Sequence, residues 1–66
     1  MNITITIKAK HQRGKIWCYA PKYPDVYGWY DTEGEASVDL RYQAKLALME
    51  QKQDIPEENI IIHFEY

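Results

Sequence analysis

Four carboxylates between positions 25 and 35 are the side chains whose type and spacing could support a reaction: Asp25, Asp31, Glu33 and Glu35. Carboxylates that converge on two metal ions about 4 Å apart hydrolyse phosphate esters. These four instead fall in a predicted turn and at a predicted helix start, where acidic groups favour the positive end of the helix dipole. We therefore predict no metal site and no catalytic residues.

One cysteine and two histidines are the other candidates for chemistry. Cys18 lies in an apolar run, His11 in a predicted turn and His63 in a predicted strand. A single cysteine excludes an intramolecular disulfide, and these histidines lack the spacing of zinc ligands. Cys18 and His63 could be neighbours in space, but such lone residues in strands are usually structural. We expect no cofactor and no enzymatic activity.

Aromatic side chains are the best candidates for binding. Alternation places four of them on one face of two predicted strands: Trp17, Tyr19, Tyr27 and Trp29. An aromatic sheet surface can stack single-stranded bases, or it can anchor a protein, because Trp and Tyr dominate interface hot spots. The opposite face is also apolar, so the pattern leaves open which of the two a helix covers.

Length and charge limit the class of protein. The chain has 66 residues, 45% of them apolar and 14% aromatic, with a formal charge of -2. A domain of this size buries only about 60% of its unfolded surface, so a partner would help its stability. The negative net charge favours binding to a basic protein over binding to nucleic acid. The start of the chain has no long apolar stretch, so we expect no membrane span and a cytoplasmic location.

The elements that position these residues follow from periodicity. Alternating Ile and Thr predict a first strand, and the polar segment Lys10 to Lys15 predicts a hairpin turn. Pro21 and Pro24 end the second strand, because proline cannot donate a ladder hydrogen bond. The four predicted strands are residues 2–8, 16–20, 26–30 and 60–66.

A capping box marks the start of the helix. Thr32 is followed three residues later by Glu35, a spacing that satisfies exposed backbone N–H groups at a helix N-terminus. The predicted helix runs from about Glu33 to about Lys52. The chain is then a single α+β domain over residues 1–66: a three-stranded antiparallel meander, one helix packed on the sheet and a C-terminal fourth strand (β-β-β-α-β).

The helix has two apolar stripes, and a single sheet can cover only one of them. The first consists of small residues and one leucine and can lie close to a sheet: Ala36, Leu40, Ala44 and Ala47. The second would be exposed and would form a homodimer interface: Val38, Tyr42, Leu46 and Met49. The alternative is one broad apolar face packed against loops and the last strand. A dimer could also use that last strand, pairing across a two-fold axis through Ile60, Ile62 and Phe64.

The segment from Pro21 to Ala36 resembles the signature of HicB-type antitoxin domains. In that family Pro-x-x-Pro-Gly-Cys is followed, after four variable residues, by Asp-Thr-x-Glu-Glu-Ala at a helix start. Here both prolines, Asp31-Thr32 and Glu35-Ala36 fall at the same intervals. The family's Gly-Cys is replaced by Asp25-Val26, and its first Glu by Gly34.

The resemblance implies a degenerate, non-catalytic relative of the RNase H fold, in a single-domain form. Such domains neutralise a small basic mRNA-cleaving toxin by binding it. We therefore predict a non-enzymatic inhibitor that masks a partner protein. Two alternatives stay open: a phage-type inhibitor of a bacterial defence complex on the same scaffold, and a single-stranded RNA-binding module. The predicted partner-binding residues are Trp17, Tyr19, Tyr23, Asp25, Tyr27, Trp29 and Asp31.

Overall fold

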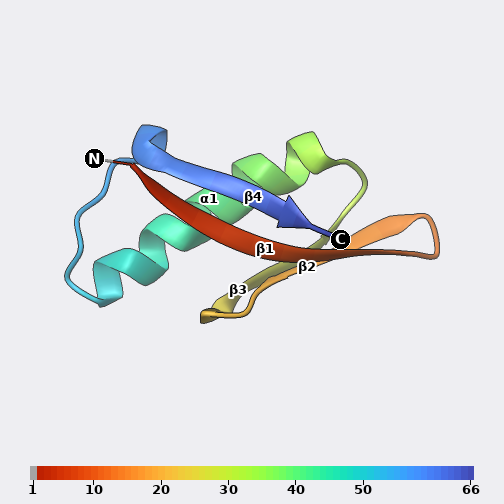
Figure 1. Ribbon diagram of the computed structural model, residues 1–66, viewed down its shortest axis with the longest axis horizontal. Coiled ribbons are helices and arrows are strands. Elements are labelled where there is room, and N and C mark those ends of the chain that lie inside the picture. Colours follow the sequence, from red (N-terminus) through yellow and green to blue (C-terminus); the bar gives the residue numbers. More distant parts are fainter. Residues whose placement is uncertain (1) are drawn as a thin grey trace.

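One helix lies across one face of a four-stranded sheet (Figure 1). The structure is a computed structural model that describes residues 2–66. Its elements are β1 (Ile3–Gln12), β2 (Lys15–Ala20), β3 (Tyr23–Tyr30), α1 (Glu33–Glu50), a 3₁₀ turn (Glu57–Asn59) and β4 (Ile60–Glu65). The strand order is β3-β2-β1-β4, with β1, β2 and β3 antiparallel and β4 parallel to β1. The predicted α+β class and β-β-β-α-β order are confirmed.

The β1–β2 hairpin is longer than predicted. β1 continues to Gln12, which pairs with Lys15, so the turn consists of Arg13 and Gly14 alone. Their φ angles are 51° and 78°, the positive values that a two-residue hairpin turn requires at both positions. The prediction of a turn over Lys10 to Lys15 was wrong, because polar residues alternate outward in a strand as readily as they occupy a turn.

β3 also begins earlier than predicted, at Tyr23, and contains Pro24. Proline is tolerated there because β3 is an edge strand, where one row of N–H groups needs no ladder partner. The register with β2 shifts between Tyr19 and Ala20, close to this proline. β2 ends at Ala20, immediately before Pro21, as predicted, whereas Pro24 lies inside β3.

The core lies between α1 and the aliphatic face of the sheet. Ala36, Leu40 and Ala44 are fully buried on the helix, as the first stripe predicted. Leu48 is also fully buried on this side of the helix, whereas Ala47 is only partly buried. The strands contribute Ile5, Ile7, Ala9, Ile16, Cys18, Ala20, Val26 and Ile60. The helix thus covers the aliphatic face and leaves the aromatic one open.

Both ends of α1 carry recognisable caps. The Thr32 hydroxyl accepts a hydrogen bond from the Glu35 N–H at 3.1 Å, so the helix begins at Glu33 as predicted. It ends at Glu50, before the predicted Lys52, because Lys52 takes a left-handed conformation with φ 61°. The N–H groups of Lys52 and Gln53 then bond back to the carbonyls of the last turn, each at 2.9 Å. This is a Schellman motif with lysine at the position that usually holds glycine.

Replacing Lys52 by glycine should therefore stabilise the protein. An L-residue is disfavoured in the left-handed region, so we expect Lys52→Gly to raise the free energy of unfolding by roughly 0.5–1 kcal/mol. Urea denaturation measures this change. The matched control is Gln51→Gly: Gln51 has an ordinary φ of -89°, and this variant should lose stability. A loss of stability in both variants would contradict the prediction.

Candidate functional site

Four aromatic rings, three of them exposed and Trp17 partly buried, form one continuous surface on the sheet face opposite α1. We call this surface the aromatic face; it consists of Trp17, Tyr19, Tyr27 and Trp29. The strand register causes the grouping, because Trp17 lies opposite Trp29 and Tyr19 opposite Tyr27. The Trp17 ring centroid is 5.1 Å from that of Trp29, 6.0 Å from Tyr27 and 6.3 Å from Tyr19. Trp29 and Tyr27 remain 52% and 53% exposed, so this surface is open to a ligand.

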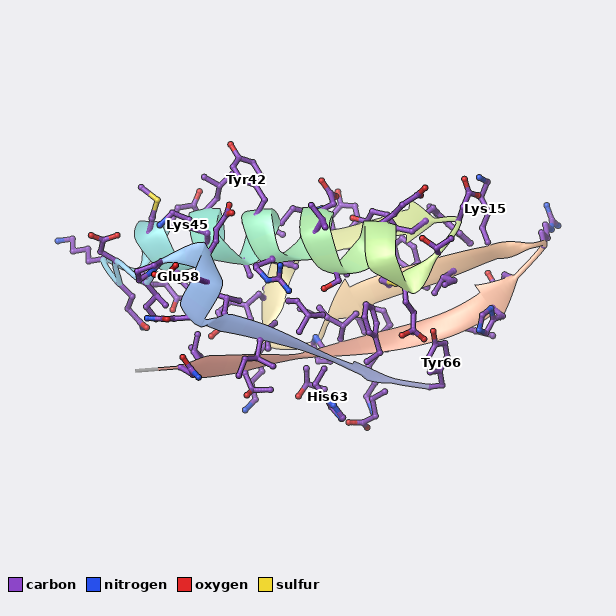
Figure 2. The ribbon with its side chains drawn as sticks, turned by 90° about the horizontal axis from the view of Figure 1, so that it is seen from above. Lys15, Tyr42, Lys45, Glu58, His63 and Tyr66 are labelled. Carbon is purple, nitrogen blue, oxygen red and sulfur yellow. The ribbon has the colours of Figure 1, made fainter. Side chains whose placement is uncertain are left out.

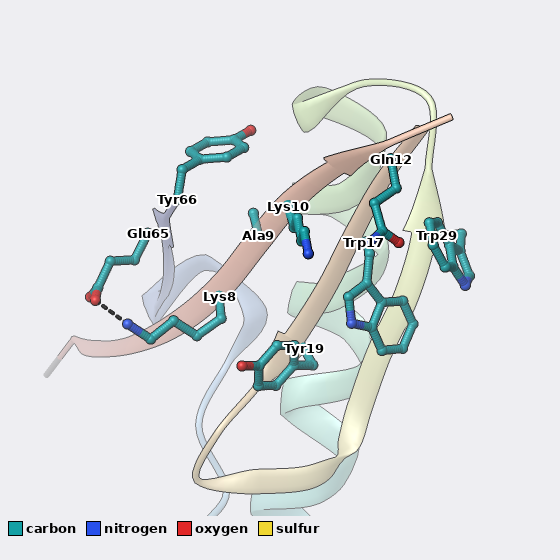
Figure 3. Close-up of a pocket in the computed structure, with 9 residues that line it drawn as sticks. All are labelled: Lys8, Ala9, Lys10, Gln12, Trp17, Tyr19, Trp29, Glu65 and Tyr66. Atoms are coloured by element: carbon teal, nitrogen blue, oxygen red, sulfur yellow. Dashed lines mark hydrogen bonds and ion pairs between the residues drawn. The ribbon is translucent and has the colours of Figure 1, made fainter. Parts of the chain in front are cut away.

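A hollow of about 660 Å³ adjoins the aromatic face over β1 and the end of β4 (Figure 3). Lys8 pairs with Tyr19 and Lys10 with Trp17 across the β1–β2 ladder, so both lysines border the rings. Lys10 and Gln12 were not predicted as lining residues, because the predicted first strand ended at Lys8. The signal was present: the period-two pattern of outward polar residues continues from Thr6 through Gln12.

Carboxylates neutralise two of the lysines beside the aromatic face. Lys8 forms an ion pair with Glu65 (Figure 3), and the Lys15 ammonium lies 2.6 Å from the Asp31 carboxylate. The hydrogen bond and the charge within each pair raise the pKa of both lysines, and those within the first pair lower the pKa of Glu65. Lys10 has no ion-pair partner within residues 2–66. The hollow therefore offers one uncompensated positive charge beside the Trp17 ring.

The remaining predicted partner-binding residues are not part of the aromatic face. Tyr23 is partly buried and packs against the core. Asp25 is exposed on β3 but does not line the hollow. Asp31 lies at the end of the sheet, where it pairs with Lys15. The structure thus brings together four of the seven residues.

A glutamine from the helix holds the outer edge of β3. The Gln43 side-chain oxygen accepts from the Tyr27 N–H at 3.1 Å, and its amide nitrogen donates to the Tyr27 carbonyl at 3.0 Å. The side chain therefore pairs with β3 as a neighbouring strand would. It fixes the backbone of a residue whose ring belongs to the aromatic face. No sequence pattern pointed to Gln43, because the contact spans 16 positions.

Tyr30 supports this edge from the core side of the sheet. Its ring lies over Gly28, where an added Cβ would be 2.5 Å from the Tyr30 hydroxyl oxygen. The hydroxyl donates to Asp39, and the Gln43 amide nitrogen lies 3.2 Å from the same hydroxyl. Burial, followed by the hydrogen bond to Asp39, raises the pKa of Tyr30 well above its usual range. Tyr30 therefore stays neutral and continues to donate at physiological pH.

Removing the Gln43 side chain should loosen β3. Gln43→Ala leaves the Tyr27 N–H and carbonyl without their partners, so we expect a loss of about 1–2 kcal/mol in unfolding free energy. Amide hydrogen exchange provides the local measurement, and protection of the Tyr27 N–H should fall more than that of the β1–β2 ladder. Gln53→Ala, on an exposed glutamine beyond the helix, is the control. Unchanged protection of the Tyr27 N–H in the Gln43 variant would contradict the role of Gln43 in holding the backbone of β3.

The groups considered for catalysis lie apart in the structure. Asp31 pairs with Lys15, and Glu33 accepts a hydrogen bond from the Tyr66 hydroxyl. Residues 2–66 contain no cluster of three or more His, Cys, Asp or Glu side chains that could hold a metal ion. Cys18 is buried on the helix side of the sheet, whereas His63 is exposed beside Thr6 on the other side of β1. The structure therefore separates Cys18 from His63, and burial raises the pKa of the thiol.

The residues predicted for dimerisation divide into two groups. The second helix stripe is exposed, and Tyr42 points away from the sheet (Figure 2). Ile60 is only 2% exposed, so its side chain belongs to the protomer core and is removed from the predicted interface. Ile62 and Phe64 are partly buried against the same core. β4 does form an edge of the sheet, and the homodimer itself stays a prediction.

Comparisons with models of protein families, with curated proteins and with solved structures found no match. The resemblance to HicB-type domains therefore stays a prediction from the residues between Pro21 and Ala36. In the part of the chain that the structure describes, no helix has the length and apolar character needed to cross a membrane. The geometry of the aromatic face consequently carries the functional argument.

Proposed function

We propose that this protein is a non-enzymatic binding module that masks a partner protein through the aromatic face. The observation that supports it is a group of four contiguous rings, three of them exposed, on a sheet whose other face is covered. Aromatic side chains bury a large area with few rotatable bonds, which makes them frequent anchors of interfaces. The β2–β3 hydrogen bonds and the Gln43 side chain fix the backbone that carries these rings before a partner arrives. Binding therefore needs little further loss of conformational entropy.

The balance of charge beside the rings favours a protein partner over RNA. Binding to RNA draws much of its affinity from lysines and arginines that replace counterions on phosphates. Lys8 and Lys15 already pair with carboxylates, and only Lys10 is uncompensated in the hollow. Arg13 adds a second cation in a smaller hollow beside Trp29. A mixture of rings, ion pairs and two separate cations matches the hot-spot centre and polar rim of a protein interface.

The identity of the partner follows from the resemblance alone. The intervals between Pro21 and Ala36 are those of HicB-type domains, so we propose a toxin nuclease as the masked protein. The alternative on the same scaffold is a phage-type inhibitor that binds a subunit of a bacterial defence complex. In both cases the protein acts by covering a surface of its partner, without chemistry of its own.

Truncating Trp29 should weaken the complex strongly. The partner is captured from a lysate on the immobilised protein, identified by mass spectrometry and purified for calorimetric titration. We expect Trp29→Ala to cost at least about 2 kcal/mol, roughly 30-fold in Kd, as at other hot spots. Trp29→Phe keeps an aromatic ring and should recover most of the affinity. Equal affinities for the wild type and the folded Ala variant would remove Trp29 from the site.

Single-stranded RNA should bind weakly or not at all. Because two of the three lysines beside the rings are neutralised, a uridine oligomer at low salt should leave the tryptophan emission unchanged. Strong quenching that decreases steeply with added salt would instead identify the aromatic face as an RNA surface. In that case Lys10→Gln tests the role of Lys10: loss of quenching in this variant would show that Lys10 contacts a phosphate.

A further inference from the structure

A second exposed surface runs along the outer side of α1, opposite the aromatic face. We call it the helix stripe; it consists of Val38, Tyr42, Leu46 and Met49. These side chains are 68%, 53%, 44% and 52% exposed, and nothing within residues 2–66 covers them. Figure 2 shows Tyr42 projecting from the helix on the side away from the strands. Large apolar residues on successive helical turns form a continuous patch, which is typical of an interface.

One edge of the helix stripe is acidic. At about 100° per residue, Asp39 and Glu50 lie along this edge and Glu35 lies within the stripe, and all three are exposed. The Asp39 carboxylate also accepts hydrogen bonds from the Tyr30 hydroxyl and the Gln43 amide. The opposite edge carries Arg41 and Lys45, but these cations are partly buried and bonded to the protein's own backbone. Arg41 donates to the Ile60 carbonyl at 3.1 Å and Lys45 to the Ile55 carbonyl at 3.2 Å. The solvent-facing charge along the stripe is therefore mainly negative.

Positive and negative charges are also unevenly distributed along the chain. Residues 1–31, which form β1, β2 and β3, contain five basic and two acidic side chains, a formal charge of +3. Residues 32–66, which form α1 and β4, contain three basic and eight acidic side chains, a charge of -5. The net charge of -2 conceals this separation. Glu65 is an exception, because it pairs with Lys8 beside the aromatic face. The remaining acidic residues of this segment still favour a cationic partner on the helix side.

We propose that the helix stripe docks a basic amphipathic helix of a partner protein. Apolar anchors at successive turns of such a helix would pack against the stripe, and its lysines or arginines would meet Glu35, Asp39 and Glu50. A second copy of this chain fits less well than a basic partner, because it would bring one -5 segment against another and like charges oppose association. This second contact goes beyond the proposed function, since it lies on the opposite side of the molecule.

A pair of synthetic helices tests the proposal with the intact chain. The probe is a fluorescein-labelled peptide of about 14 residues, built from leucine and lysine with the leucines on one helical face. Its counterpart replaces every lysine by glutamate. We expect fluorescence anisotropy to show at least about tenfold tighter binding of the lysine peptide. The double variant Tyr42→Ser, Leu46→Ser should lose at least about tenfold of that affinity, whereas Trp29→Ala should keep it.

Three outcomes would overturn the proposal. Equal affinities for the lysine and the glutamate peptide would show that the acidic residues do not favour a basic helix. If Trp29→Ala loses peptide binding while the Tyr42→Ser, Leu46→Ser variant keeps it, the peptide binds to the aromatic face. Light scattering that gives a dimer for the wild type and a monomer for the helix variant would assign the stripe to a second copy. The proposed function is tested separately, by the affinity of the Trp29 variants for the captured partner.

Discussion

The packing of α1 on the aliphatic side of the sheet determines which surfaces this protein presents. The sheet has two apolar sides and the chain has one helix to cover them. Ala36 and Ala44 are fully buried on the side of the helix that faces the aliphatic residues of the sheet. Tyr23 and Tyr30 pack against this core, whereas the four rings of the aromatic face point to the other side of the sheet. The aromatic surface therefore results from which side of the sheet the helix covers.

Polar contacts also fix the helix against the strands at both edges of the sheet. Gln43 and Asp39 connect α1 to β3, while Arg41 connects it to β4 at the opposite edge. The helix thus holds both edges of the sheet as well as its centre. At the β3 edge the glutamine also occupies backbone groups that could otherwise pair with another chain, a common hazard of edge strands. The same contacts leave the outer side of the helix without an intramolecular partner.

Local patterns in the sequence were sufficient for the elements and their order. The alternation around Ile5 and the hydroxyl of Thr32 each depend on neighbouring residues, so the strands and the helix start could be predicted. The sheet side chosen by the helix, the Gln43 clamp and the parallel pairing of β4 depend on residues far apart in the chain. The lysines beside Trp17 were missed for a related reason: a polar strand end and a polar turn have the same composition, and only pairing distinguishes them.

The parallel pairing of β1 with β4 has a consequence for how the protein reaches its native state. Ile3 pairs with Ile60, so the first and last strands must meet across nearly the whole chain. The hairpins and the helix can form from nearby residues, but this closure carries a large entropic cost before its contacts are gained. Until then one edge of β1 is uncovered and the side chain of Ile60 is missing from the core. Pairing of β4 with β1 is therefore the step that covers this edge of the sheet and completes the core.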